Sequence, residues 1–235
     1  MYSLVIKDTE YQLPEDFTIS HWKEITKYDI SIPFNHKKII SVAFKIDYDE
    51  VDIIPDKTVE LLIAFISVML YPQDSKLNKD YMGGDYINLN GLTLGKFIDL
   101  EVYLSDGINK GIDKLIETLW GIDVTDEVKI SGVWGGINTF IDYRNNLYKN
   151  YTNLFGTDED GEYLKVEKDT TTVDIKRIWY DIILTLAEGK FLYIDKVTDK
   201  PLISAFNWLA WNKDKMEKEQ EQLKKNDLQR NNRHI

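Results

Sequence analysis

An internal repeat of a helix-forming segment constrains this chain more than any other feature. Residues 18–22 (TISHW) and 93–97 (TLGKF) share one order: threonine, aliphatic residue, small residue, basic or imidazole residue, and large aromatic residue. Further along, residues 38–51 (KIISVAFKIDYDEV) correspond to residues 114–128 (KLIETLWGIDVTDEV), with one residue of slippage. Because neither copy of a repeated helical pair buries its apolar face alone, such a pair is a packing unit. We therefore expect a diverged duplication.

The remaining patterns favour a mainly α fold with short β-hairpins. Alternation over residues 2–13 predicts a hairpin, and residues 85–90 predict a short strand ahead of the second helical pair. In the helix expected over residues 36–45, four apolar residues at helical spacing should face the core: Ile39, Ile40, Ala43 and Phe44. We expect a first helical unit at 1–72, a second, repeat-like unit at 85–130, and a C-terminal helical part at 131–235 that ends in a long polar helix.

Composition limits the classes of partner. The chain has a net charge of −11 and a pI near 4.8, so nucleic acid is an unlikely general partner because phosphate binding needs a basic field. It contains no cysteine, which excludes disulfides and thiolate chemistry. The most apolar segment, residues 61–70 (LLIAFISVML), is too short for a helix that needs about twenty residues to cross a bilayer. We expect it to be a buried core helix and expect no membrane partner.

The sequence shows no recognisable catalytic constellation. The three histidines lie apart in sequence, and no nucleophile-elbow or phosphate-loop motif occurs. The glycine cluster at residues 132–136 (GVWGG) is more simply explained by a close approach to a helix than by phosphate binding. We expect no enzyme activity, no catalytic residue and no cofactor. An enzyme with an unrecognised site remains a third hypothesis, and a concave pocket lined by converging carboxylates would be its signature.

An acidic loop containing Asp158 and Asp160 resembles part of a calcium-binding loop. If Gly161 took the sixth position of an EF-hand loop, Glu167 would take the twelfth, but the first position would be Gly156, which has no side-chain oxygen. A solvated turn is therefore the favoured interpretation, and we expect no metal site.

The last predicted helix changes character at Asn212. It begins apolar, whereas the tail from Lys213 to Ile235 carries seven basic and five acidic residues with few apolar ones. A charged helix without a core face either projects into solvent or lies on a partner. Tryptophans with a polar edge are favoured at interfaces. The candidate partner-binding residues are Trp208, Trp211, Lys215, Lys218, Lys224, Lys225 and Arg230.

Several stretches together resemble a known group of proteins. Residues 93–104 (TLGKFIDLEVYL) followed by 114–121 (KLIETLWG) resemble small proteins from the structural-gene modules of tailed bacteriophages of Bacteroidetes hosts, including the crAss-like phages. Residues 39–66 resemble the same group and the helical tail assembly chaperones, and residues 186–219 match the group's ending of helix, short connector, last helix and charged tail. These patterns span most of the chain but reflect helix packing rather than ligand binding.

The resemblance implies a non-enzymatic virion component, structural or packaged, at or near the tail or portal. Its implied partners are other phage structural proteins, with possible self-association. Its implied location is the virion, and the host cytoplasm during assembly. The alternative implied function is a tail assembly chaperone that binds the tape-measure protein and is absent from the mature particle.

Overall fold

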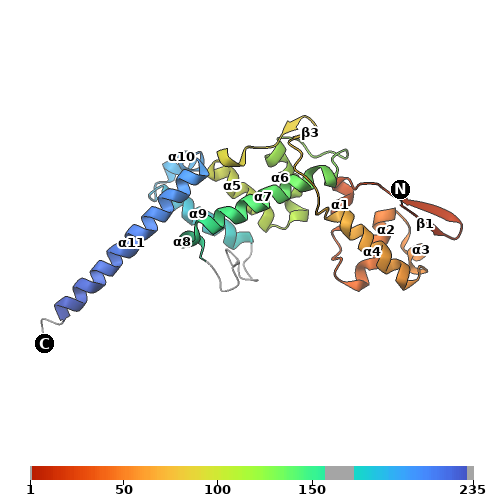
Figure 1. Cartoon of the computed structure of the whole chain (residues 1–235), viewed down its shortest axis with the longest axis horizontal. Coiled ribbons are helices and arrows are strands. Elements are labelled where there is room, and N and C mark those ends of the chain that lie inside the picture. The colour runs from red at the N-terminus through yellow and green to blue at the C-terminus, as the bar shows by residue number, and fades with distance from the viewer. Residues whose placement is uncertain (1, 157–171, 232–235) are drawn as a thin grey trace. The chain divides into compact units, whose positions relative to one another are not determined.

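The computed structural model describes residues 2–156 and 172–231, and these residues are mainly helical (Figure 1). Two small antiparallel strand pairs accompany helices α1–α11. The predicted mainly α fold with short hairpins is confirmed. The acidic loop around Asp158 and Asp160 lies outside the described residues.

The chain folds into two compact units, each made of two separate stretches of sequence. Unit 1 comprises Met1–Ile87 and Asp106–Ile141, and unit 2 comprises Asn88–Ser105 and Asp142–Ile235. This division differs from the ranges 1–72, 85–130 and 131–235 expected from sequence. The two helices of the expected second repeat separate, because the first packs in unit 2 and the second in unit 1.

Unit 1 holds both hairpins and most of the shorter helices. Its elements are β1 (Tyr2–Ile6), β2 (Thr9–Leu13), α1 (Ile19–Ile25), α2 (His36–Phe44), α3 (Tyr48–Asp52), α4 (Asp56–Leu70), β3 (Asp80–Tyr81), β4 (Gly84–Asp85), α6 (Ile108–Trp120) and the first part of α7 (Ile130–Asn150). The predicted hairpin is present, with Lys7 and Asp8 at its turn. Both have positive φ, at 46° and 65°, which suits the tight turns that match strand twist.

Unit 2 is built from α5 (Leu94–Ser105), the rest of α7, α8 (Thr152–Phe155), α9 (Thr172–Leu186), α10 (Ile194–Thr198) and α11 (Leu202–Asn231). Aromatic rings form much of its core. Phe206 of α11 lies within 6.4 Å, centroid to centroid, of four other rings: Phe97, Tyr151, Phe155 and Trp179. Large rings bury much apolar area each, so this cluster fixes where α11 begins in its unit.

The two repeated threonines occupy the same structural position in their units. Thr18 forms an isolated antiparallel bridge with Lys129, just before α7, and Thr93 forms one with Pro201, just before α11. In each bridge, the residue after the threonine and the residue after its partner donate backbone hydrogen bonds. These bonds are Ile19 N to Val128 O, Ile130 N to Phe17 O, Leu94 N to Lys200 O and Leu202 N to Leu92 O, at 2.8–2.9 Å.

The aromatic residue of each repeat also has an equivalent partner. Trp22 lies 6.1 Å from Trp134 between ring centroids, and Phe97 lies 5.9 Å from Phe206. Each partner ring follows its bridge residue by the same interval in the chain. The repeated element is therefore a threonine-started helix whose first residues are bridged to the segment just before a helix far along the chain.

Helices α2 and α6 also end alike. Lys45 and Gly121 follow them in the left-handed conformation, with φ of 56° and 70°, as the correspondence between Phe44 and Trp120 requires. After these residues the two copies differ in structure, because α3 follows α2, whereas an irregular segment follows α6. The four predicted core residues of α2 are all buried.

Helix α4 contains residues 61–70, which the sequence predicts to form a buried core helix, and its burial is one-sided. Its inner face is buried through Val59, Ile63, Ile66 and Leu70. On its outer face, Leu61 and Val68 are each 66% exposed. The segment is apolar on both faces, and the core of unit 1 covers only one.

The glycine cluster of α7 does admit close approach, but the approaching groups do not come from a helix backbone. A Cβ atom at Gly135 would overlap the Lys76 carbonyl, and one at Gly136 would overlap the ring of Trp120. Residues 75–78, which include Lys76, have no regular secondary structure. The cluster therefore lets an irregular segment and aromatic rings pack directly on the α7 backbone.

Candidate functional site

The first half of α11 is anchored in unit 2. Leu202, Ala205 and Phe206 are buried, and Phe206 sits in the aromatic cluster described above. Further along, Lys213 donates to the Asn153 carbonyl, and Asn153 Nδ2 lies 3.3 Å from Asp214 Oδ1. Beyond Asp214, the described side chains of α11 form no hydrogen bond or ion pair with described residues outside the helix, so we take Asp214 as the end of the anchored part.

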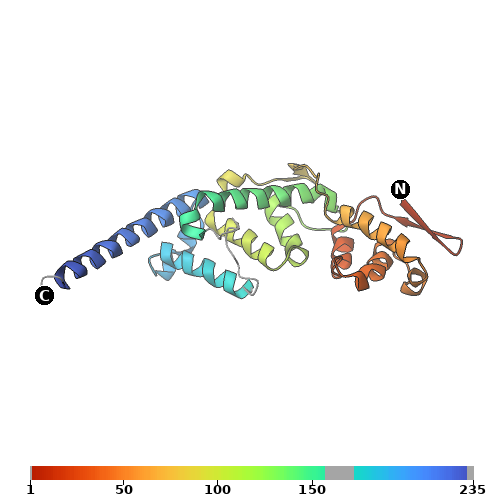
Figure 2. The ribbon, with the colours of Figure 1, turned by 60° about the horizontal axis from the view of Figure 1, so that its bottom comes forward.

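The second half of α11 is a solvated helix. Every side chain of residues 213–226 is exposed, and this half extends beyond the other helices of unit 2 in both views (Figure 1, Figure 2). From residue 215 to the end of α11, a rise of 1.5 Å per residue gives a length of about 25 Å. The predicted long polar helix is therefore present, and it offers a large accessible surface.

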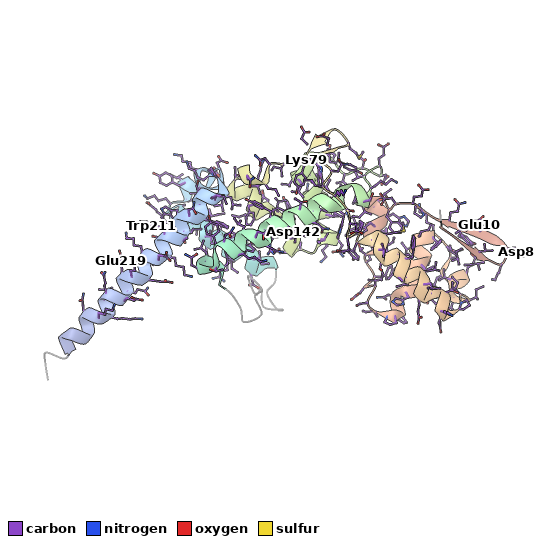
Figure 3. The ribbon with its side chains drawn as sticks, viewed as in Figure 1. Asp8, Glu10, Lys79, Asp142, Trp211 and Glu219 are labelled. Carbon is purple, nitrogen blue, oxygen red and sulfur yellow. The ribbon has the colours of Figure 1, made fainter. Side chains whose placement is uncertain are left out.

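The two candidate tryptophans have different environments. Trp208, 37% exposed, lines a depression of about 240 Å³ with other residues of unit 2, including Leu186 and Val197. Trp211 (Figure 3) is 58% exposed. The Lys215 ammonium lies 5.4 Å from the centroid of the Trp211 ring. The structure thus brings Trp211 and Lys215 together at the start of the solvated half and leaves Trp208 partly packed in its own unit.

The candidate basic residues are partly neutralised within the helix. Lys215 Nζ lies 3.8 Å from Glu219 Oε1, and Lys225 Nζ lies 4.0 Å from Glu221 Oε2. Such exposed pairs contribute only a few tenths of a kcal/mol. Lys218 and Lys224 are exposed. Arg230 belongs to α11, but its side chain lies outside the described part of the chain.

Sequence reasoning missed a buried ion pair in unit 2. The Glu101 side chain is 4% exposed and accepts two hydrogen bonds from the Arg144 guanidinium, from Nε and, at 3.1 Å, from Nη2. The Tyr148 hydroxyl donates to Glu101 Oε2 at 2.7 Å, and the guanidinium carbon lies 4.8 Å from the Tyr148 ring centroid. Arg144 and Tyr148 lie one helical turn apart on α7, which was readable from sequence, but nothing in sequence identifies Glu101 as their partner.

An apolar cavity of about 210 Å³ lies beside this pair. Its lining residues are Glu101, Leu154, Phe155, Ile175, Ile178, Trp179, Ile182 and Leu209. Glu101 alone of these is charged, and its carboxylate oxygens are already engaged by Arg144 and Tyr148. The cavity is thus suited to apolar groups, and it does not show converging carboxylates.

Burial has a chemical consequence for Tyr148. Its pKa is raised well above the ordinary value, first by burial and then by the negative charge of Glu101. A raised pKa stabilises the folded state below the unfolded tyrosine pKa of about 10, and this contribution is lost as the pH rises further.

We therefore expect the free energy of unfolding to fall above about pH 10, and to fall less steeply in Tyr148→Phe. Urea unfolding followed by circular dichroism at stepped pH measures this slope. Tyr180→Phe, which alters an exposed tyrosine of the same unit, is the matched control and should keep the steeper decline. Equal slopes for the two variants would contradict the assignment.

No described helix is long and apolar enough to span a membrane. Within residues 2–156 and 172–231, no group of three or more histidine and acidic side chains is placed to hold a metal ion. Comparison with protein-family models, curated proteins and solved structures gives no match.

Proposed function

We propose that this chain is a non-enzymatic component of a tailed-phage particle, structural or packaged, that acts through protein–protein contacts at or near the tail or portal. The exposed second half of α11 carries the proposal, together with the sequence resemblance. The exposed side chains of residues 213–226 gain little stability from packing within the chain, so a partner surface would stabilise this half of the helix. Its partners are other phage structural proteins, and it resides in the virion after assembly in the host cytoplasm.

The chemistry of the contact follows from α11. Trp211 supplies a large exposed ring at the point where the helix leaves its unit, and Lys215 covers part of that ring. Aromatic anchors flanked by charged residues are typical of interface centres and rims. The acidic chain as a whole disfavours nucleic acid as the partner.

Mass spectrometry of purified particles tests the proposal. Abundant peptides of this chain, at a constant ratio to the major structural proteins, are expected. Their absence from particles, combined with co-purification of the tape-measure protein from infected cells, would instead favour a tail assembly chaperone. The resemblance of residues 39–66 to such chaperones motivates that second candidate.

Deletion of all residues after Asn212 should separate stability from assembly. Because side chains 213–226 are exposed, and the contacts of Lys213 and Asp214 with Asn153 lie at the surface, we expect the Tm to stay nearly unchanged while incorporation into particles is lost. Thermal melts and quantitative mass spectrometry of complemented particles measure the two effects. A variant with the tail residues in scrambled order, which keeps charge and helix propensity, should also fail to incorporate. Normal incorporation of the truncated chain would refute the role of α11.

A further inference from the structure

A polar hollow of about 460 Å³ in unit 1 is lined by residues that lie far apart in the sequence. Its lining residues are Pro14, Asp16, Thr18, Ser20, His21, Glu24, Lys45 and Lys129. Lys45 directly follows α2, and Lys129 directly precedes α7. The bridge between Thr18 and Lys129 holds the second lysine beside the start of α1, so the hollow exists only when unit 1 is folded.

The two carboxylates that line the hollow are already engaged. Asp16 accepts hydrogen bonds from the backbone N–H and from the hydroxyl of Ser131. Both carboxylate oxygens of Glu24 lie 2.6 Å from the Lys27 ammonium. Neither carboxylate is therefore the partner of a lysine in the hollow.

The two lysines that line the hollow have no such partner. Within the described part of the chain, neither Lys45 nor Lys129 forms an ion pair, although Lys45 also lines a neighbouring hollow with the acidic Glu15. Acidic residues outnumber basic ones by 40 to 29 in this chain, so carboxylates are the more abundant partners. Two unpaired lysines in one hollow are thus an exception to the charge balance of the chain.

The ring of His21 lies within electrostatic reach of both lysines. Its Nε2 lies 2.9 Å from the Val42 carbonyl oxygen, which can only accept, so Nε2 carries the hydrogen of the neutral ring. The pKa of His21 is lowered from its ordinary value, first by burial, and the charges of Lys45 and Lys129 also lower it. The Val42 bond and the charge of Glu24 act in the opposite direction. An anion bound between the lysines would therefore raise this pKa.

We propose that the hollow binds a small phosphomonoester through its phosphoryl group, with the ammoniums of Lys45 and Lys129 as the counter-charges. A phosphoryl group carries a charge of about −1.5 to −2 at pH 7 and three strong acceptor oxygens, which suits two ammoniums and neighbouring hydroxyls. Thr18 and Ser20 supply hydroxyls in the same hollow. Lysine binds phosphate as a point charge, whereas paired hydrogen bonds to a carboxylate typically come from arginine, and no arginine is among the described residues of this lining.

The size and polarity of the hollow limit the rest of the ligand. Small-molecule sites commonly have volumes of about 300–1,000 Å³. A phosphoryl group alone would leave part of the hollow empty, so the ligand should carry a further small group. Pro14 is the one apolar residue among the described lining residues, so this group should be polar, as in a sugar or polyol phosphate. The inference does not depend on the proposed function, since it concerns the isolated chain in solution.

NMR titration of the histidine rings of the full chain tests the proposal. The chain has three histidines, and the signals of His21 are identified by their loss in His21→Gln. We expect glycerol 3-phosphate, at constant ionic strength, to raise the pKa of His21 and to saturate at concentrations on the order of 1 mM. His36, whose Nε2 contacts the Ile30 carbonyl outside the hollow, is the internal control, and its ring signals should not respond to the ligand.

Two results of this titration would overturn the proposal. One is the absence of a saturable response of His21 up to about 10 mM glycerol 3-phosphate. The other is an equal response to sodium chloride at the same ionic strength, which would show that general screening of charge is sufficient.

Substitution of the lysines separates a defined site from a general attraction of anions. Lys45→Gln and Lys129→Gln should each weaken the binding of glycerol 3-phosphate by at least about tenfold, because each removes a charged hydrogen-bond donor. Lys110→Gln, at an exposed lysine of α6 in the same unit, is the matched control and should leave the affinity unchanged. Equal effects of the three variants would contradict the proposal. Circular dichroism melts establish that each variant still folds.

A comparison of probes identifies the class of ligand. Glycerol 3-phosphate should bind more tightly than inorganic phosphate, because its polyol group fills space that phosphate leaves empty, and glycerol alone should not bind. Equal affinities for the two phosphates would overturn the assignment of a phosphomonoester in favour of free phosphate. Binding of a single-stranded oligonucleotide without binding of either phosphate would overturn it in favour of a nucleic-acid contact.

Discussion

Replacing Arg144 with methionine is expected to destabilise the protein by about 3 kcal/mol, the lower end of the range for removing one partner of a buried ion pair. The cost arises from Glu101, whose side chain is 4% exposed and would keep only the hydrogen bond from Tyr148. We expect a loss of stability at the lower end of that range because the Arg144 side chain is itself 24% exposed. Urea unfolding of the full chain, followed by circular dichroism, measures the loss.

Two companion variants make this result specific. Arg177→Met removes an exposed arginine from α9 of the same unit and should change stability by less than about 0.5 kcal/mol. The double variant Arg144→Met with Glu101→Leu should recover most of the lost stability, because replacing both charges by apolar groups removes the desolvation penalty. A small effect of Arg144→Met alone would mean that water reaches the Glu101 carboxylate.

Replacing Gly135 with alanine should cost about 3 kcal/mol, the upper part of the usual range for overpacking. Normally alanine stabilises a helix interior by about 1 kcal/mol relative to glycine, so the expected sign is opposite to the helix propensity. The reason is steric: the new Cβ would meet the backbone carbonyls of Lys76 and Ser75, which cannot rotate away as a side chain can.

Gly91→Ala is the matched control for Gly135. A Cβ at Gly91 would lie 3.4 Å from the nearest atom, which belongs to the Asn88 side chain, so its effect should be small. Thermal or urea unfolding compares the two variants. A Gly135→Ala protein as stable as the wild type would show that residues 75–78 move away from α7 without cost.

Local features of this fold were predictable because they follow from residue spacing. The burial of Ile39, Ile40, Ala43 and Phe44 follows from one helical stripe, and the β1–β2 hairpin follows from alternation around a short polar turn. The polar second half of α11 follows in the same way from its lack of an apolar stripe.

Long-range pairing was not predictable from the same patterns. The repeat at Thr18 and Thr93 was visible, but its partners Lys129 and Pro201 share no residue type, and their common interval to an aromatic residue does not by itself mark a bridge. That α4 would be buried on one face only was not predictable, because hydrophobicity alone does not say how many faces of a helix its neighbours cover. Glu101 was missed for a related reason, since a buried carboxylate is recognised only when its cation is placed beside it.

The threonine bridges also bear on how the nascent chain matures on the ribosome. The bridge partner of Thr18, Lys129, and that of Thr93, Pro201, are each synthesised about a hundred residues after the threonine. Thr93 is synthesised before Lys129, so the second bridge is still incomplete when the first becomes possible. During this interval the nascent chain therefore contains both α1 and α5 before either has its bridge partner. A stop codon between Lys129 and Pro201 would release a product that can form the Thr18 bridge but lacks the partner of Thr93.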